Sequence, residues 1–166
     1  MPNKSEVIVL IGPMGVGKST VGKKLARVLK LPFCDTDNLI VEEHGKITEI
    51  FSKYGEDAFR KLEHAALVKA IAQPGVVATG GGAVLLDRSR EILKDATVIY
   101  LATDGKHIAS RLRNGSRPLL KNGIEDWKTI YEARKPLYEQ AADITIDTSG
   151  QPLAQTVSEI TERLGS

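Results

Sequence analysis

The sequence predicts an α/β fold, in which a parallel β-sheet lies between two layers of helices. Three observations predict it. Residues 7–11 read Val-Ile-Val-Leu-Ile, and a continuous apolar run of this length is typical of a strand buried on both faces. A glycine-rich stretch at 12–19 follows directly and leads into an amphipathic helical pattern. Further short apolar runs then alternate with helical patterns along the chain, as in a three-layer α/β/α protein.

Each further element follows from a local pattern. Four more strands are expected, at residues 31–34, 76–79, 97–101 and 144–146. The first helix is expected to bury one face, formed by Val21, Leu25, Val28 and Leu29. Asp87 and Asp104 are expected to cap two short helices, and Pro152 to stand in the first turn of the last helix. These patterns do not fix the order of the strands in the sheet.

Length, charge and composition restrict the class of protein. The 166 residues, with a mass of 18.0 kDa, suit one domain spanning 1–166. A net charge of +2 gives no basic surplus for nucleic acid, and no apolar run approaches the ~20 residues of a membrane span. The polar start carries no secretion signal, and the single cysteine, Cys34, excludes an internal disulfide. We therefore expect a cytoplasmic protein that binds neither nucleic acid nor membrane. A monomer is the expected oligomeric state, although these properties do not determine it.

Residues 12–19 read Gly-Pro-Met-Gly-Val-Gly-Lys-Ser and match the phosphate-loop pattern G-x-x-x-x-G-K-[ST] between a strand and a helix. In such a loop the backbone N–H groups surround a phosphate chain, and the helix N-terminus adds its dipole. Lys18 is expected to reach the β- and γ-phosphates, and the Ser19 hydroxyl to bind Mg²⁺. Because the sequence has no Asn-Lys-x-Asp run of the kind found in GTP-binding switches, ATP is the expected nucleotide. The candidate ATP-binding residues here are Gly12, Met14, Gly15, Val16, Gly17, Lys18, Ser19 and Thr20.

Two carboxylates follow the second expected strand, in the run Asp35-Thr36-Asp37. Both can face the crevice in which open α/β sheets bind ligands. One could organise the water around Mg²⁺, and the other could accept the proton of a substrate hydroxyl, which a kinase requires. Asp37 could instead only cap the helix that it opens, and the sequence leaves these two interpretations of Asp37 equally open.

Arginines and glycines complete the candidate site. Arg134 has no acidic residue one helical turn away, which favours binding of an external anion. Arg60 has acidic helical neighbours, so a surface ion pair competes with a ligand role. The run Gly80-Gly81-Gly82 indicates a backbone that approaches a ligand closely. Residues 114–123 are polar with glycine near both ends, as in a mobile lid, and Arg117 would arrive with it. These features indicate a small ATP-dependent kinase whose acceptor carries a hydroxyl and a carboxylate.

The sequence resembles the shikimate kinase family from about residue 6 to residue 164. The shared motifs are the phosphate loop, extended to Thr20, and the segments 33–37, 59–63, 79–84, 117–120 and 134–138. The resemblance implies a five-stranded parallel sheet in the order 2-3-1-4-5, with a phosphate loop and a mobile lid. It also implies transfer of the γ-phosphate of ATP, with Mg²⁺, to the 3-hydroxyl of shikimate, a step in the biosynthesis of chorismate and aromatic amino acids.

By motif position, the resemblance assigns roles to single residues of this sequence. Lys18 and Arg117 would stabilise the transferring phosphoryl group, with Asp37 acting on the acceptor hydroxyl. Ser19 would bind Mg²⁺ directly, and Asp35 would bind it through water. The acceptor-binding region would span about 35–63 and continue into the glycine run. Shikimate would be bound by Asp37, Arg60, Gly80, Gly81, Gly82 and Arg134.

The resemblance also places adenine between Arg111 and Pro152, although Arg113 could take the part of Arg111. Glu63 would hold Arg60 in place, so an ion pair and a ligand role of Arg60 can coexist. A gluconate kinase would share the phosphate loop, but it should lack the motifs at 35–37 and 117–120. A nucleotide-dependent switch protein is disfavoured because the sequence has no Asn-Lys-x-Asp run.

Overall fold

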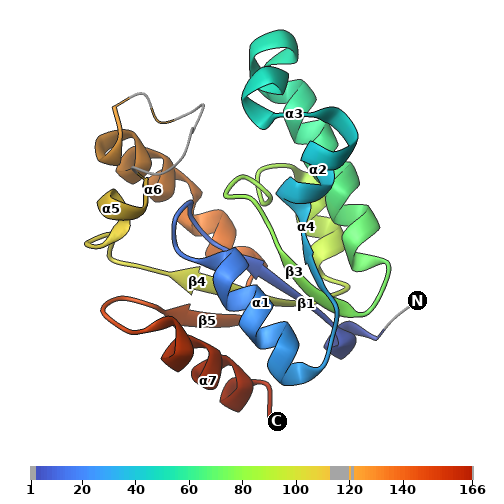
Figure 1. Ribbon diagram of the computed structural model, residues 1–166, viewed down its shortest axis with the longest axis vertical. Helices are drawn as coiled ribbons and strands as arrows, with labels where there is room; N and C mark the ends of the chain where they lie inside the picture. The colour runs from blue at the N-terminus through green and yellow to red at the C-terminus, as the bar shows by residue number, and fades with distance from the viewer. Residues whose placement is uncertain (1–2, 113–119, 121, 166) are drawn as a thin grey trace.

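The computed structural model describes residues 3–112, 120 and 122–165, which form one parallel sheet with helices on both sides (Figure 1). The five strands are β1 Val7–Ile11, β2 Phe33–Asp35, β3 Gly75–Ala78, β4 Thr97–Ala102 and β5 Ile144–Asp147. All neighbouring strands are parallel, and their order is β2-β3-β1-β4-β5. The predicted α/β class and the predicted strand order 2-3-1-4-5 are both confirmed.

The central strand, β1, positions the candidate site. It pairs with β3 on one side and with β4 on the other, and all five of its residues are buried. Because the strands are parallel, the segments that follow β1, β2 and β3 leave the sheet at the same edge. The glycine-rich loop, the run at 35–37 and the three glycines at 80–82 therefore meet at this edge.

Helices cover both faces of the sheet. They are α1 Lys18–Leu29, α2 Thr36–His44, α3 Ile47–Ile71, α4 Asp87–Leu93, α5 Ile108–Leu112, α6 Ile124–Ala141 and α7 Leu153–Arg163, and a short 3₁₀ helix, η1 Lys4–Glu6, precedes β1. The face with α1 and α7 buries Leu25 and Ile160 against the sheet, while α3 to α6 pack on the opposite face. A smaller cluster around Ile40, Ile50 and Phe59 joins α2 to α3. We call α2 and the first half of α3 the arm, because they project from the sheet (Figure 1). None of the described helices has the length and apolar character of a membrane span.

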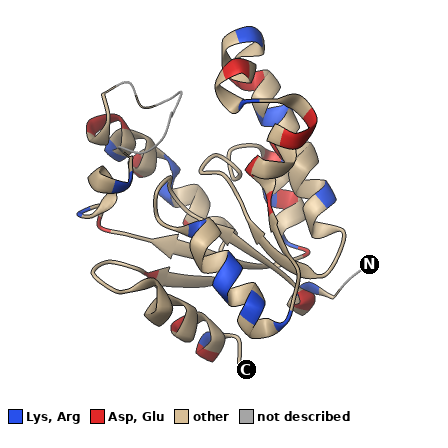
Figure 2. Ribbon diagram, in the orientation of Figure 1, with Lys and Arg blue, Asp and Glu red and all other residues tan. Residues whose placement is uncertain are grey.

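Some details of the predicted helices are wrong. Val28 is 59% exposed on the outer face of α1, which carries lysine and arginine (Figure 2), so Val28 does not belong to the packed face. Asp87 is the first residue inside α4 and does not cap it. Asp104 lies well before α5, which begins at Ile108, and its carboxylate accepts a backbone N–H two residues further on. Pro152 stands at the N-cap of α7, one residue before the expected position.

Candidate active site

Glycines at both ends shape the loop between β1 and α1. Gly12 has a φ of +147°, and a side chain there would lie 2.6 Å from the carbonyl oxygen of Leu101. Gly17, the N-cap of α1, has a φ of +103°, a left-handed conformation that favours glycine. The Lys18 Nζ donates to the carbonyl oxygens of Gly12 and Pro13 at 2.6 and 2.9 Å. The loop is therefore curled around its own lysine, as a phosphate loop requires.

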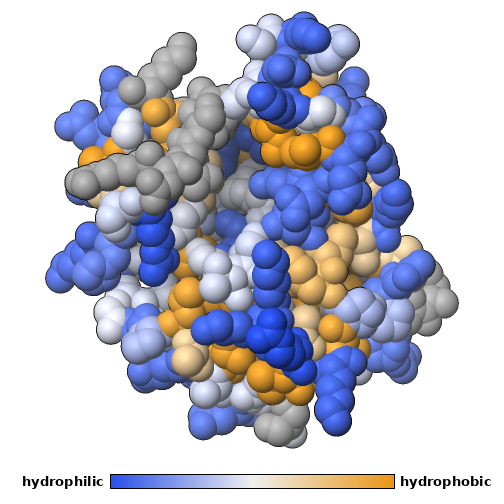
Figure 3. Space-filling model, viewed as in Figure 1, coloured by the Kyte–Doolittle hydropathy of each residue, from blue (hydrophilic) through white to orange (hydrophobic). Residues whose placement is uncertain are grey.

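A cavity of about 210 Å³ lies at the N-terminal end of α1, where the space-filling view shows a hollow beside the arm (Figure 3). It is lined by Met14, Gly15, Gly17, Lys18, Ser19, Thr20, Asp37, Thr79, Gly80 and Gly81. Two predicted loop residues, Gly12 and Val16, do not line it, and the Val16 side chain is instead buried in the core on the α1 side. The cavity brings the predicted phosphate-binding residues and the predicted acceptor residue Asp37 to one place.

Asp35, at the end of β2, connects the phosphate loop to the arm. Its Oδ2 accepts a hydrogen bond from the Ser19 hydroxyl at 2.5 Å. Its Oδ1 accepts the backbone N–H groups of Asp37 and Asn38 at 2.9 and 3.3 Å, which makes Asp35 the N-cap of α2. The helix-cap interpretation of Asp37 is therefore wrong, because α2 is capped two residues earlier. Asp37 instead lines the cavity at the N-terminal end of α1.

The oxygen donors of Ser19 and Asp35 fit a Mg²⁺ ion. Hydroxyl and carboxylate oxygens are hard ligands, and Mg²⁺ in phosphate sites takes few protein ligands, with phosphates and waters completing its octahedron. Among the described residues, no three His, Cys, Asp or Glu side chains form a group that could hold a metal ion without such help. The donor set therefore suits a metal that enters with the nucleotide.

Each glycine of the run at 80–82 faces a predicted acceptor residue. A Cβ on Gly80 would lie 3.0 Å from the Asp37 Oδ1, and a Cβ on Gly81 would lie 3.3 Å from the Arg134 Nη1. A Cβ on Gly82 would overlap the guanidinium of Arg60. None of the three has a positive φ, so the glycines are needed for close approach and not for backbone conformation. The side chains predicted to bind the phosphate acceptor therefore lie against this run, which we call the glycine wall.

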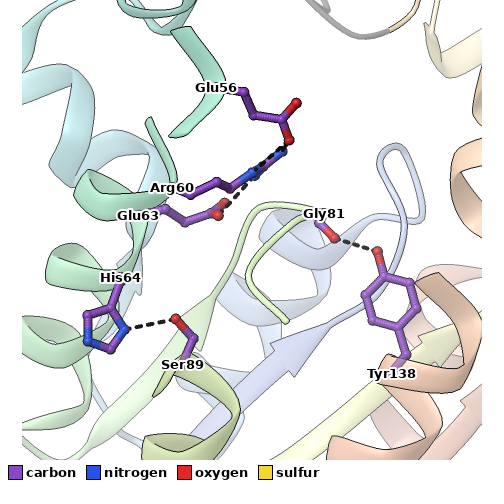
Figure 4. Close-up of polar contacts among 7 residues, drawn as sticks. All are labelled: Glu56, Arg60, Glu63, His64, Gly81, Ser89 and Tyr138. Carbon is purple, nitrogen blue, oxygen red and sulfur yellow. Dashed lines mark hydrogen bonds and ion pairs between the residues drawn. The ribbon is translucent and has the colours of Figure 1, made fainter. Parts of the chain in front are cut away.

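Arg60 lies on α3 between two carboxylates (Figure 4). Its Nη1 donates to the Glu63 Oε1 at 2.9 Å, while its Nε and Nη2 donate to the Glu56 Oε2 at 3.2 and 3.1 Å. Burial raises the pKa of the Glu63 carboxyl, and the positive charge of Arg60 opposes that rise. Next to Glu63, the His64 Nδ1 makes a 2.8 Å hydrogen bond with the Ser89 Oγ of α4, which anchors this part of α3. Arg60 is thus held by an ion pair in the position where a ligand role was predicted.

Arg134 reaches the same wall from α6. It is buried, and it shares a side-chain hydrogen bond with Tyr138, one helical turn further on. The Tyr138 hydroxyl donates to the carbonyl oxygen of Gly81 at 2.5 Å (Figure 4), and burial raises the pKa of this phenol to about 12. Tyr138 therefore stays protonated and fixes both α6 and the glycine wall at ordinary pH.

Sequence reasoning missed the structural role of Trp127. Its ring packs at a tilt against the ring of Tyr131 in the core, with the ring centroids 5.0 Å apart. Its indole N–H also donates to the carbonyl oxygen of Met14 in the phosphate loop at 2.8 Å. A contact across 113 residues leaves no local pattern, so no signal in the sequence could have identified it.

A second cavity, of about 230 Å³, lies beside the phosphate loop between the loop after β5 and α5. Arg111 and Pro152, the pair predicted for adenine, both line it. The Arg111 Nη1 donates to the carbonyl oxygen of Gly15 at 2.8 Å, which connects this cavity to the phosphate loop. Arg113 and Arg117 lie outside the described residues, as does most of the predicted lid at 114–123.

The capping role of Asp35 can be separated from its charge. Asp35→Ala should lower the free energy of unfolding by about 1 kcal/mol, because two backbone N–H groups at the start of α2 lose their acceptor. Asp35→Asn keeps an oxygen at the cap and should differ from the unsubstituted protein by less than about 0.5 kcal/mol. Urea unfolding of the three proteins measures both values. Equal losses in the two variants would show that the cap is not what stabilises α2.

Comparison with known proteins agrees with this geometry. A family model for shikimate kinase matches residues 14–165. A shikimate kinase of Rhodococcus jostii is 44% identical over 164 residues, which cover 94% of this chain and 96% of that protein. A solved structure of a shikimate kinase from Acinetobacter baumannii, in complex with shikimate, has a TM-score of 0.91 at 36% identity and covers 96% of this chain and 92% of its own. A gluconokinase from Sinorhizobium meliloti shares the fold, with a TM-score of 0.64 at 20% identity and coverage of 99% and 94%.

These matches cover both the phosphate loop and the glycine wall. The identity to the relatives extends over nearly their full length as well as that of this chain. The chain therefore belongs to the shikimate kinase family.

Proposed function

We propose that this protein transfers the γ-phosphoryl group of ATP to the 3-hydroxyl of shikimate, giving shikimate 3-phosphate and ADP on the route to chorismate and aromatic amino acids. The observation that carries the proposal is the cavity that Lys18 and Ser19 share with Asp37. Family membership points to the same reaction. A phosphate donor held by the loop would therefore lie next to the carboxylate that meets the acceptor.

The nucleotide would lie across the two cavities. Its adenine would occupy the 230 Å³ cavity between Arg111 and Pro152, and its phosphates would follow the loop to the N-terminus of α1. Lys18 now bonds two loop carbonyls, and it would turn from them to the β- and γ-phosphates. Its charge would stabilise the oxygens of the phosphoryl group during transfer.

The acceptor would bind between the arm and the glycine wall. Arg60 and Arg134 would bind its carboxylate, because guanidinium groups form paired hydrogen bonds with planar carboxylates. Asp37 would accept the proton of the reacting hydroxyl, since it lines the cavity beside the loop. The related structure from Acinetobacter baumannii, which is described as a complex with shikimate, supports this choice of acceptor.

Mg²⁺ and Arg117 complete the proposal. Ser19 would bind the metal directly and Asp35 would bind it through a water molecule. The metal would neutralise negative charge on the phosphates. Arg117 lies outside the described residues, and its role on the transferring phosphoryl group rests on the family resemblance, as does the mobile lid. We also propose that the chain forms a single domain and works in the cytoplasm as a monomer. Size-exclusion chromatography would test the oligomeric state.

The reaction itself can be tested with a coupled assay of ADP release. With ATP and Mg²⁺, shikimate should give rapid turnover, while quinate and gluconate should give little above the rate without acceptor. The physical reason is that the acceptor end of the site offers two buried arginines for a carboxylate, beside Asp37 for the reacting hydroxyl. Omission of Mg²⁺ should abolish turnover. Equal rates with gluconate and shikimate would contradict the proposed acceptor.

The role of Asp37 can be tested without disturbing the fold. Asp37→Asn should lower kcat with shikimate by on the order of 10² or more, because the amide cannot accept the hydroxyl proton. Its melting temperature should change by no more than about 3 °C, since Asp35 and not Asp37 caps α2. Turnover and differential scanning calorimetry give the two readouts. Near-normal turnover of Asp37→Asn would remove the general base from the mechanism.

The close approach of Arg60 to the glycine wall gives a further prediction. Gly82→Ala should weaken shikimate binding by on the order of tenfold, because the new methyl group takes the space of the guanidinium. ATP affinity should stay nearly unchanged, since Gly82 does not line the phosphate cavity. Isothermal titration with each ligand separates the two. A parallel loss of both affinities would indicate general damage to the site.

A further inference from the structure

Each of the three guanidinium nitrogens of Arg60 already donates one hydrogen bond to a side chain of its own helix. Glu63 accepts from Nη1, and Glu56 accepts from Nε and Nη2. We propose that Glu56 holds the edge of Arg60 that binds the acceptor carboxylate, and that the entering carboxylate displaces it. This inference rests on the proposed function, in which Arg60 is a ligand of that carboxylate. Glu56 then sets how strongly, and how selectively, the site takes a carboxylate acceptor.

The two glutamates differ in how firmly they are placed. The Glu63 side chain is 5% exposed and bonds Arg60 at 2.9 Å. The Glu56 side chain is 46% exposed, and its two contacts with Arg60 are longer, at 3.1 and 3.2 Å. An exposed ion pair is worth little, whereas removing one partner of a buried pair leaves a charge without compensation. Glu56 is therefore the partner that can leave, and Glu63 is the partner that stays.

The geometry of the Glu56 contact favours its replacement. Both donors of Arg60, Nε and Nη2, share the single oxygen Oε2. A guanidinium binds a carboxylate best through two parallel hydrogen bonds, one to each oxygen. A ligand that enters free to orient can offer both oxygens to this edge, and the tethered Glu56 does not.

The charge balance at the acceptor end also favours the departure of one carboxylate. Two arginines, Arg60 and Arg134, face the glycine wall together with Asp37 and Glu63. Glu56 adds a third carboxylate, so carboxylates outnumber arginines by one. An anionic acceptor would enter against this excess. When the entering carboxylate displaces Glu56, it takes the place of that charge, so the number of carboxylates around the two arginines does not rise.

The chain provides a stable position for the displaced carboxylate. Gly55 interrupts α3 with a φ of 83° and a ψ of 176°, so Glu56 begins the second half of the helix. Carboxylates are favoured at helix N-termini, where they meet unpaired N–H groups and the positive end of the dipole. A displaced Glu56 would thus lose its ion pair with Arg60, but its carboxylate would be solvated and would still lie at the positive end of its own helix segment.

The test compares Glu56→Gln with a matched control, Asp57→Asn. Both substitutions remove one negative charge from adjacent positions of α3. Asp57 is exposed, and no hydrogen bond or ion pair joins it to any other residue that the structure describes. Isothermal titration with shikimate should show binding about two- to fivefold tighter for Glu56→Gln, the fold-change that corresponds to loss of an exposed ion pair. Asp57→Asn should bind like the unsubstituted protein.

A neutral ligand separates competition from a merely structural effect. The methyl ester of shikimate has no negative charge to compete with Glu56. Glu56→Gln and the unsubstituted protein should therefore bind the ester equally, and the gain should appear only with the acid. If Glu56→Gln folds poorly, Glu56→Ala should show the same difference between acid and ester. A crystal structure with shikimate should show Glu56 beyond 4 Å of Arg60, the limit of an ion pair.

Two results would overturn the inference. If Glu56→Gln binds shikimate as tightly as the unsubstituted protein or more weakly, Glu56 does not compete for Arg60. An equal gain with acid and ester would show that Glu56 acts on the shape of the site and not through its charge. By contrast, failure of the unsubstituted protein to bind or phosphorylate shikimate would overturn the proposed function itself. The titration of the unsubstituted protein thus distinguishes the two failures.

Discussion

Helix α6 holds the two halves of the site at a fixed distance, and the rest of the site depends on this constraint. The Trp127 indole donates to the Met14 carbonyl in the phosphate loop, and the Tyr138 hydroxyl donates to the Gly81 carbonyl in the glycine wall. The donors are 11 residues apart, which corresponds to about 16 Å along a helix. Buried indole and phenol groups must find acceptors, so α6 cannot slide along the sheet without leaving them unpaired. Arg134 lies between these two contacts and is placed by both.

Burial of Arg60 and Arg134 beside the glycine wall removes both charges from water. The fold offsets this desolvation more fully for Arg60 than for Arg134. Arg60 has the buried carboxylate of Glu63, which offsets its desolvation. Arg134 has Tyr138 and the more distant charge of Glu63. A buried guanidinium that is only partly compensated becomes more stable when an anion binds. In the proposed function, Arg134 is therefore the arginine that is prepared for a carboxylate before one arrives, and little rearrangement would be needed on the α6 side.

Much of this arrangement could be predicted from local sequence. The apolar run of β1, the phosphate-loop pattern and the spacing of the strands predicted the fold, and family motifs predicted Asp37, Arg60 and Arg134. The errors arose where tertiary contacts override local patterns. β2 ends at Asp35, so this residue caps α2, and the sequence had offered Asp37 for that part. The sequence sets a surface ion pair of Arg60 against a ligand role, and the structure places a buried carboxylate, Glu63, and a half-exposed one, Glu56, on the same guanidinium. The contact of Trp127 with the phosphate loop depends wholly on how α6 packs.

The elements that hold the phosphates and those that hold the acceptor come from different parts of the fold. The phosphate loop belongs to β1 and α1, at the centre of the sheet, where a change of backbone would disturb strand pairing on both sides. The side chains proposed to bind the acceptor stand on α2, α3 and α6, outside the sheet, and only the glycine wall comes from a strand end. Side chains on these outer helices can change without altering the loop. This separation explains how a gluconokinase at 20% identity can share the fold. In the proposed function, acceptor choice would therefore depend on the arm, α6 and the three glycines, and the phosphate loop would contribute little to it.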